Sequence, residues 1–257
     1  MIHPTAIVSP GAQVGDGAEI GPFAVIGEGV VLGRGCRVGA HAILEGPATF
    51  GEENQIFPHA SLGLPPQDLK YRGDPTELHV GARNVFREFS TVHRGTVGGG
   101  GVTRVGDDNY LMAYIHIAHD CRIGSRTIFA NYAALAGHVE VGDDAIIEAF
   151  CAVQQFNRVG RHAFMGAMTR APQDVLPFVK TVGTDSVKTY GVNAIGLKRK
   201  GFSDERIDAL KEIYRVLVSP RLNTSQAVER IEAEFSGNED ATYIVEFIRT
   251  ARRGVHK

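Results

Sequence analysis

An aliphatic or aromatic side chain recurs at every sixth position over most of this chain. The first run of repeating positions is Ile2, Val8, Val14, Ile20, Ile26, Leu32, Val38, Leu44, Phe50, Ile56 and Leu62. The spacing returns at Val80, Phe86 and Val92, and it then continues from Val105 to Met165. A period of six fits neither an amphipathic helix, with a period of about 3.6, nor a half-buried strand, with a period of about two. A short, fixed period of this kind is typical of a solenoid.

Two further positions of each hexad are restricted. The residue four places after the repeating side chain is small, as at Ala24, Ala42 and Ala133, and the residue directly after it is often glycine, as at Gly27 and Gly124. Large and small side chains therefore alternate on one inward face, and glycine tolerates the tight turn that follows. Three hexads form one triangular coil. The sequence thus predicts a mainly β fold, a parallel β-helix of about ten coils, which in hexapeptide-repeat proteins winds left-handed.

The repeat is interrupted twice before it ends near residue 177. The first interruption, residues 63–79, keeps the sixfold phase, whereas the second, residues 93–104, shifts the phase by one residue. Loops that leave a rigid scaffold often carry function, although tolerated surface length is the simpler alternative. We therefore expect a β-helix over residues 1–177 with two loop insertions, followed by a linker and a small α-helical domain over residues 178–257.

The C-terminal part has helix signals in place of hexads. Ser203 can cap a helix whose apolar positions from Ile207 to Leu217 share one face, and Thr224 or Ser225 can begin a second helix before Gly237. A third helix is predicted around 244–251. Basic residues gather in this part: Lys198, Arg199, Lys200, Arg206, Arg215, Arg221, Arg249, Arg252 and Arg253. They indicate either a solvated helix face or a surface for acidic partners.

Bulk composition argues against several classes of protein. The formal net charge is −2, so no overall basic field attracts nucleic acid or anionic lipid. No apolar run approaches the ~20 residues that cross a bilayer, and the repeat begins at Ile2 without a leader-like segment. We therefore expect a cytoplasmic protein that binds no nucleic acid and does not insert stably into membranes.

All three cysteines occupy the small inward position of a hexad. Cys36, Cys121 and Cys151 each lie four residues after a repeating side chain. This placement predicts core packing and argues against a disulfide framework, a zinc cluster or a cysteine nucleophile, because a reactive thiol must be exposed.

The segment from Ala113 to Arg122 concentrates groups that can exchange protons. His119 lies two places after a repeating position, at a predicted coil corner, and Asp120 follows it directly. Histidine can act as a base near neutral pH, and an adjacent carboxylate can orient it. His138 lies eighteen residues after Asp120, so stacked coils should bring the three side chains to one exposed edge. Spacing alone leaves open whether His119 is catalytic.

The motifs between the hexads resemble one known family over essentially the whole chain. They are Gln67 to Tyr71, Thr91 to Thr96, His116 to Cys121, Leu135 to Val139, Gly191 to Asn193 and Gly196 to Ser203. With these segments the chain closely resembles the UDP-N-acetylglucosamine acyltransferases, the first enzymes of lipid A synthesis. Hexads alone would be weak evidence, because enzymes with different activities share them.

The resemblance implies direct acyl transfer without a cofactor or a metal. A 3-hydroxyacyl thioester on acyl carrier protein is attacked by the 3-hydroxyl of the GlcNAc of UDP-GlcNAc. His119 matches the family's general base, Asp120 its supporting carboxylate, and the N–H of Gly137 its oxyanion donor. The family is a homotrimer whose active site lies between adjacent solenoids.

The resemblance also implies a set of substrate-binding residues. Sugar- and phosphate-proximal positions match Asp68, Lys70, His116, His138 and Gln155. Asn193 and Arg199 match positions near the nucleotide, and Asn131 matches one near the acyl-pantetheine arm.

Two residues depart from the family pattern. Gln154 precedes Gln155 where the family commonly has His-Gln, so a cationic role at that position is lost. Ala167 occupies a position that limits acyl length, where Gly accompanies long chains and Met short ones; the intermediate Ala predicts a medium-to-long 3-hydroxyacyl group. Some members of the family accept the acyl group on a 3-amino group instead, which the sequence leaves open.

Three other readings compete with this one. A γ-class carbonic anhydrase uses the same solenoid but needs three histidine ligands for zinc, for which His116, His119 and His138 are available. A purely structural β-helix would lack a reason for the His-Asp cluster. The N-acyltransferase that acts later in lipid A synthesis is similar but carries an additional N-terminal domain.

Overall fold

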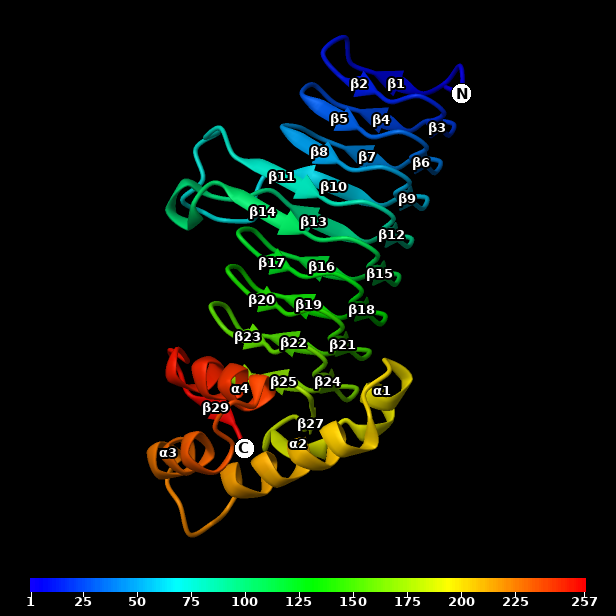
Figure 1. Cartoon of the computed structure of the whole chain (residues 1–257). Helices are drawn as coiled ribbons and strands as arrows, with labels where there is room; N and C mark the ends of the chain where they lie inside the picture. Colours follow the sequence, from blue (N-terminus) through cyan, green and yellow to red (C-terminus); the bar gives the residue numbers. More distant parts are fainter.

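Each hexad forms one short strand, and each strand pairs in parallel with the strand one coil further along. The computed structural model describes all 257 residues, and its strands form three sheets that run the length of the solenoid (Figure 1). The first sheet contains β1 (Ile7–Val8), β4 (Val25–Ile26), β7 (Ile43–Leu44), β10 (Ser61–Leu64), β13 (Thr91–His93), β16 (His116–Ile117), β19 (Ala134–Leu135), β22 (Ala152–Val153) and β25 (Arg170–Ala171).

The other two sheets each have ten strands. The second sheet contains β2 (Gln13–Val14), β5 (Val30–Leu32), β8 (Ala48–Phe50), β11 (Glu77–Val80), β14 (Val102–Val105), β17 (Arg122–Ile123), β20 (Glu140–Val141), β23 (Arg158–Val159), β26 (Asp174–Val175) and β29 (Val255–His256). The third contains β3 (Glu19–Ile20), β6 (Arg37–Val38), β9 (Gln55–Ile56), β12 (Val85–Phe86), β15 (Tyr110–Leu111), β18 (Ile128–Phe129), β21 (Ile146–Ile147), β24 (Phe164–Met165), β27 (Val179–Val182) and β28 (Lys188–Val192).

The inward positions of the hexads form one continuous core. Repeating side chains such as Ile26, Phe86 and Phe129 are fully buried, and small residues such as Ala42 and Ala133 fill the space between them. Close packing of large against small side chains along the axis stabilises the stacked coils. The fold class predicted from the repeat, a left-handed parallel β-helix with a C-terminal helical domain, is confirmed.

The cysteines lie in this core as predicted. Cys36, Cys121 and Cys151 are buried and free. Burial raises the pKa of Cys121 to about 12 and that of Cys151 to about 11, so both stay protonated near neutral pH. Neither thiol has the exposed thiolate that nucleophilic chemistry needs.

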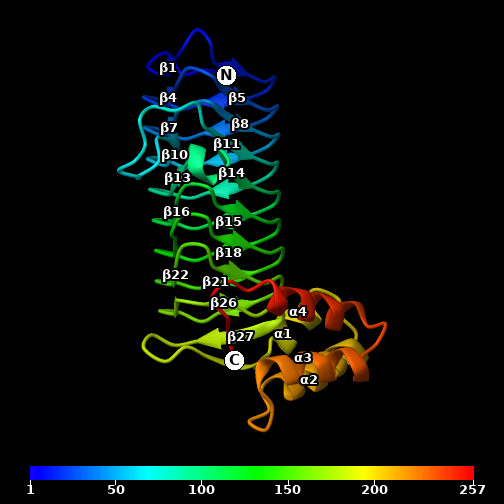
Figure 2. The same ribbon diagram turned by 90° about the vertical axis from the view of Figure 1, so that its left-hand side faces the viewer.

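Both insertions leave the solenoid at neighbouring coils and on the same corner, between the first and second sheets (Figures 1 and 2). They are shorter than the ranges 63–79 and 93–104, because β10 continues to Leu64, β11 begins at Glu77, and β14 begins at Val102. The second loop contains a single 3-10 turn, η1 (Val97–Gly99).

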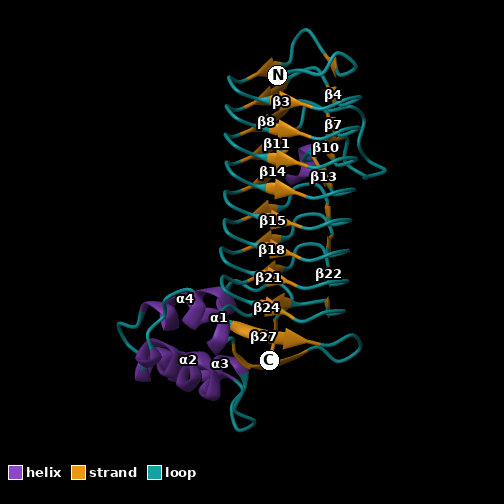
Figure 3. Cartoon of the chain, turned by 90° about the vertical axis from the view of Figure 1, so that its right-hand side faces the viewer, coloured by secondary structure: helices purple, strands orange, loops and turns teal.

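The β-helix continues beyond its predicted end at residue 177. β27 still pairs in parallel with β24, and β28 then folds back antiparallel to β27. The helices that follow, α1 (Ala194–Arg199), α2 (Asp204–Leu217), α3 (Thr224–Glu234) and α4 (Glu239–Arg249), gather at this end of the solenoid (Figure 3). None of them combines the length and hydrophobicity required to cross a membrane.

The helical part follows the sequence prediction with four differences, one of which is that α4 spans Glu239–Arg249 and so begins and ends before the predicted range 244–251. Ser203 caps α2 as predicted, whereas Asn223 caps α3 in place of Thr224 or Ser225. The short helix α1 and the last strand β29 have no predicted counterpart. β29 returns from the helices to pair with β26, so the chain ends beside the last coil.

Candidate functional site

The corner between the first and second sheets carries most of the side chains singled out by sequence. His119, Gly137 and Gln155 occupy the same position of three successive coils, and Asp120 and His138 occupy the next one. We call this edge the first corner. Backbone hydrogen bonds join successive coils at this corner; for example, the N–H of His138 donates to the carbonyl of His119 at 3.0 Å. A constant coil of eighteen residues therefore places these groups together.

His119 and Asp120 form a direct pair. Nδ1 of His119 lies 2.7 Å from Oδ2 of Asp120. The side chain of His119 is 16% exposed and that of Asp120 is fully buried. The expectation that Asp120 is exposed is wrong, because the second loop folds over the corner and covers it.

The second loop also supplies donors to Asp120. The backbone N–H of Thr96 donates to Oδ1 at 2.8 Å, and the hydroxyl of Thr96 donates to Oδ2 at 2.6 Å. Although burial acts to raise it, the pKa of Asp120 is lowered from its ordinary value, because hydrogen bonds from His119 and Thr96 favour the carboxylate. Asp120 is therefore ionised near neutral pH.

Three further histidines surround the pair. The rings of His138 and His119 meet edge to face at 5.3 Å, and Nε2 of His138 lies 3.6 Å from Oδ2 of Asp120. His116 lies with Nδ1 2.8 Å from the hydroxyl of Thr91, and burial, with the nearby His93 and His119, lowers its pKa to about 4. His116 is thus neutral at pH 7, so any hydrogen bond it offers is that of an uncharged ring.

His93 belongs to the same cluster and was missed as a site residue. Its Nδ1–H donates to the carbonyl of Pro65 at 2.6 Å, and its ring packs edge to face on His116 at 5.4 Å. Burial lowers the pKa of His93. Its place in the Thr91 to Thr96 motif was the only sequence signal for it.

A cleft of about 690 Å³ opens beside the first corner. Asp68 and Lys70 of the first loop line it, together with Asp120, His138 and Arg252 of the C-terminal tail. The carboxylate of Asp68 accepts a hydrogen bond from the backbone N–H of Lys70 at 2.9 Å, which orders the tip of that loop. Both insertions and the end of the chain thus contribute to one polar cleft.

Gly137 lies directly against the ring of His119. A Cβ atom at this position would lie 2.6 Å from Cε1 and 2.8 Å from Nε2 of His119. The N–H of Gly137 makes no hydrogen bond within the chain. Only glycine therefore fits here without moving the imidazole, and its N–H is available to a ligand.

Four other predicted residues lie away from this cleft. Asn131 and Ala167 are exposed on the corner between the third and first sheets. Asn193 caps α1 and donates to the carbonyl of His162, at the corner between the second and third sheets, while Arg199 is exposed at the end of the same helix. Within one chain these residues do not meet His119. Gln155 is exposed on the first corner, two coils beyond His119.

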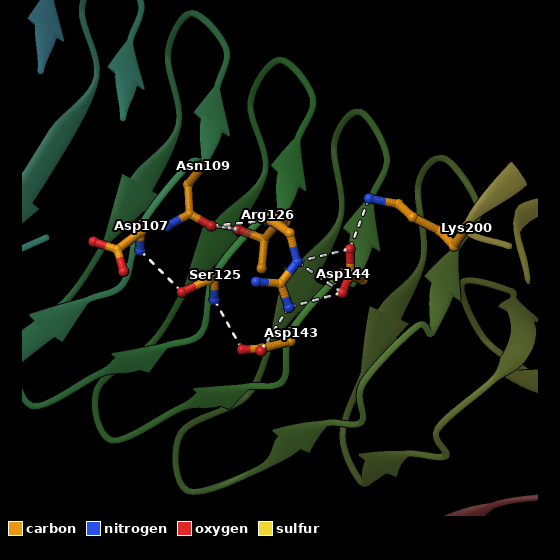
Figure 4. Close-up of polar contacts among 8 residues, drawn as sticks. Asp107, Asn109, Ser125, Arg126, Asp143, Asp144 and Lys200 are labelled. Carbon is orange, nitrogen blue, oxygen red and sulfur yellow. Dashed lines mark hydrogen bonds and ion pairs between the residues drawn. The ribbon is translucent and has the colours of Figure 1, made fainter. Parts of the chain in front are cut away.

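The basic triplet at the end of α1 divides into paired and free side chains. Lys200 lies 2.6 Å from Asp144, which also binds Arg126 of the solenoid (Figure 4). Lys198 pairs with Asp204, whereas Arg199 forms no ion pair. Lys200 therefore anchors α1 to the β-helix, and Arg199 is the member of the triplet that is free to bind a ligand.

The donor atoms of His119, Asp120 and His138 lie within 4.8 Å of one another. This is a set of two histidines and one carboxylate, and His116 is not part of it. The oxygens of Asp120 already accept hydrogen bonds from Thr96 and His119. The arrangement differs from the three-histidine site of a γ-class carbonic anhydrase and suits proton transfer better than metal binding.

Comparisons with known proteins agree with one another. A family model described as UDP N-acetylglucosamine O-acyltransferase, domain 2, matches residues 174–256, and a bacterial transferase hexapeptide model matches residues 11–46 and 102–137. The acyl-[acyl-carrier-protein]–UDP-N-acetylglucosamine O-acyltransferase of Burkholderia orbicola is 48% identical over 99% of this chain and 98% of its own length. The enzyme of the same name from an Anaeromyxobacter species is also 48% identical, over 99% of this chain and 98% of its own.

Solved structures give the same result. The UDP-N-acetylglucosamine acyltransferase of Francisella novicida is 39% identical with a TM-score of 0.97, covering 100% of this chain and 94% of that one. The corresponding protein of Bacteroides fragilis is 39% identical with a TM-score of 0.96, covering 100% of both chains. With this identity over nearly its whole length, the chain belongs to the UDP-N-acetylglucosamine acyltransferase family.

Proposed function

We propose that this protein transfers a 3-hydroxyacyl group from acyl carrier protein to the 3-position of the GlcNAc of UDP-GlcNAc, the first step of lipid A synthesis, with His119 as the general base. The reaction is supported by the 48% identity, over nearly the whole chain, to acyl-[acyl-carrier-protein]–UDP-N-acetylglucosamine O-acyltransferases. The observation that supports the mechanism is the His119–Asp120 pair, in which a buried carboxylate holds one nitrogen of a partly exposed imidazole.

The pair fixes which nitrogen of His119 can act. Because the carboxylate of Asp120 accepts a hydrogen bond, Nδ1 carries the proton and Nε2 keeps its lone pair. Nε2 removes the proton of the sugar 3-hydroxyl as its oxygen attacks the thioester carbonyl. The resulting imidazolium then protonates the sulfur of the departing pantetheine thiol, and the new ester forms. General-base catalysis of this kind contributes typically about 10²- to 10⁴-fold.

Gly137 is proposed to stabilise the tetrahedral intermediate. Its N–H has no partner in the chain and lies beside the His119 ring, so it can donate to the oxyanion while Nε2 handles the proton. Asp68, Lys70 and His138, which line the cleft, are proposed to bind the sugar and phosphate groups. His116 is proposed to bind the same part of the substrate as a neutral ring, and Gln155 to complete the site further along the corner.

A homotrimer would complete the site. Five outward positions of the first sheet and five of the third are apolar, whereas four successive outward positions of the second sheet are charged. The apolar rows are Ile7, Val25, Ile43, Ala134 and Ala152 on the first sheet, and Val85, Tyr110, Ile128, Ile146 and Phe164 on the third. The charged row is Arg104, Arg122, Glu140 and Arg158. Two adjacent apolar faces on a prism suit a closed ring of three copies, in which each first sheet packs on a neighbour's third sheet.

The corner between those two sheets supports this arrangement. It carries a stack of exposed rings whose neighbours lie about 5 Å apart: Phe23, His41, His59, Phe89, Tyr114, Tyr132 and Phe150. In a trimer this corner faces the threefold axis, where Asn131 would meet the acyl-pantetheine arm and Ala167 the end of the acyl chain. Asn193 and Arg199 would reach the nucleotide bound at the first corner of the neighbouring copy.

The proposed location is the cytoplasm, because the donor is acyl carrier protein. Three free, buried cysteines suit a reducing compartment.

One assay tests the reaction, the acceptor and the chain length together. Purified protein is incubated with UDP-GlcNAc or its 3-amino analogue and with 3-hydroxyacyl carrier proteins of several lengths. We expect transfer to UDP-GlcNAc with a medium-to-long optimum, and near-complete loss of turnover in His119→Ala. No transfer to either acceptor would contradict the function, equal rates at all lengths would contradict the role of Ala167, and an active His119→Ala would remove His119 as base.

The oligomeric state is tested separately. Analytical ultracentrifugation should give a single species of three times the chain mass of 27.7 kDa, and the same species for His119→Ala. A stable monomer with full activity would contradict a site shared between copies.

A further inference from the structure

The second loop covers Asp120 and forms hydrogen bonds with it. Thr96 begins the turn η1, and its hydroxyl accepts a hydrogen bond from the N–H of Gly99 at 3.2 Å while it donates to Oδ2 of Asp120 at 2.6 Å. Because the amide of Gly99 can only donate, the hydroxyl proton of Thr96 is directed to the carboxylate. The orientation of this hydroxyl is therefore fixed by the loop.

The glycines of the loop have separate reasons to be glycine. A Cβ on Gly99 would lie 2.0 Å from the carboxyl carbon of Asp120, so only a bare backbone can pass over this side chain. Gly100 and Gly101 adopt φ of 94° and 81°, which bring the chain back to β14. Close approach to the Asp120 carboxylate thus explains Gly99, and left-handed backbone explains Gly100 and Gly101.

The backbone of Asp120 is held as firmly as its side chain. Its φ of 61° is left-handed, and its N–H donates to the hydroxyl of Thr103, on β14, at 2.7 Å. The side chain then accepts from the N–H and the hydroxyl of Thr96 and from Nδ1 of His119. Asp120 is therefore held in one position, and Thr96 donates to both of its carboxylate oxygens, sharing Oδ2 with His119.

We propose that Thr96 is a positioning residue for the proposed reaction, which acts through Asp120 to keep the imidazole of His119 in the orientation and tautomer that a general base needs. Its hydroxyl, the carboxylate and the imidazole form a continuous chain of hydrogen bonds from the second loop to the reacting centre. This role rests on the proposed function of His119. This role also gives a function to the second loop, because a regular hexad turn would leave the first corner uncovered.

The substitution that tests this role is Thr96→Val, which keeps the shape and the backbone N–H but removes the hydroxyl. A hydrogen bond to a charged group, if expressed fully in the transition state, corresponds to a loss of about 10- to 100-fold in rate. We expect kcat to fall by about that factor, with KM for UDP-GlcNAc and for acyl carrier protein changed less than about twofold. Thr96→Ser restores the hydroxyl and should recover most of kcat.

Thr76 offers a matched control. It is fully buried at the end of the first loop, and its hydroxyl has no hydrogen-bond partner. Thr76→Val deletes a buried hydroxyl without touching Asp120, so its kcat should remain that of the unmodified enzyme. Unchanged kcat in Thr96→Val, an equal loss in Thr96→Ser, or an equal loss in Thr76→Val would each overturn the proposal.

A spectroscopic readout separates this proposal from the proposed function. The proton on Nδ1 of His119 should give a downfield NMR signal in histidine-labelled protein, assigned by its disappearance in His119→Ala. We expect the signal in the unmodified protein and in Thr96→Ser, and its loss or a marked shift in Thr96→Val. An unchanged signal in Thr96→Val would refute the positioning role whether or not the protein transfers acyl groups, whereas a changed signal without any acyl transfer would leave the proposed function as the part that failed.

Discussion

Replacing Gly137 by alanine tests the contact on which the proposed site depends. The added Cβ would lie 2.6 Å from Cε1 of His119, whereas carbon atoms in contact are ordinarily about 3.5 to 4.0 Å apart. The imidazole must therefore move by about 1 Å. It cannot do so freely, because Nδ1 is hydrogen-bonded to Oδ2 of Asp120 at 2.7 Å. The backbone itself permits alanine, since Gly137 is not among the residues with positive φ.

Two magnitudes follow from this contact. A displacement of about 1 Å at a reacting group can cost about 10²-fold in rate, so we expect kcat of Gly137→Ala to fall by about that factor. Overpacking of a tight site typically costs about 1 to 3 kcal/mol, so we expect a loss of this size in the free energy of unfolding. Acyl-transfer kinetics and urea denaturation measure the two effects.

A double-mutant cycle isolates the contact between the two residues. His119→Ala removes the ring that the new methyl group meets, so Gly137→Ala introduced into that background should cost almost no further stability. The four proteins of the cycle are compared by urea denaturation. An equal loss of stability in both backgrounds, or a Gly137→Ala enzyme with normal kcat and Tm, would refute the reasoning.

Three further predictions concern other parts of the chain. Cys121→Ala should leave kcat unchanged, and thiol-alkylating reagents should not inactivate the folded enzyme, because burial raises the pKa of this thiol to about 12; rapid inactivation that Cys121→Ala abolishes would contradict this. Arg199→Ala should raise KM for a substrate by about tenfold or more, whereas Lys198→Ala, which breaks only an exposed ion pair, should change it less than about twofold; equal effects would argue against a ligand role for Arg199. The pKa of His116 is lowered from 6.5 to about 4, so the unfolded state binds its proton more readily and stability should fall as the pH drops from 6.5 towards 4. Thermal unfolding of His116→Asn should show a shallower fall in Tm over that range, and an identical slope would contradict the assignment.

The stacking of the candidate site was predictable because the coil length is constant. His119 and Gly137 are eighteen residues apart, so a repeat of three hexads brings them together whatever the side chains are. The burial of Asp120 was not predictable in this way. It depends on the path of the second loop. Neither the phase shift nor the run of glycines predicts the direction in which that loop folds. The same limit applies to His93, whose hydrogen bond is to the carbonyl of Pro65 in the other loop.

The C-terminal part shows a second limit of sequence reasoning. The apolar face from Ile207 to Leu217 predicts α2 well, because a long amphipathic pattern indicates a helix without information from distant parts of the chain. Helix α1 has only six residues with Gly196 in the middle, and its position is set by Lys200 on Asp144 and by the Asn193 cap. A two-residue strand such as β29 is defined entirely by its partner, which lies about 80 residues earlier in the chain.

The pairing of β29 with β26 has a consequence for how this chain folds during synthesis. Every other parallel pair of strands joins residues 16 to 30 apart in the sequence, so the solenoid can form one turn at a time during synthesis. The last coil is different, because Val175 pairs with His256, which lies 81 residues further along the chain. The outer edge of β26 therefore stays unpaired until the helices and the residues of β29 have been synthesised. A chain truncated before β29 is therefore the form most prone to add further strands at that edge.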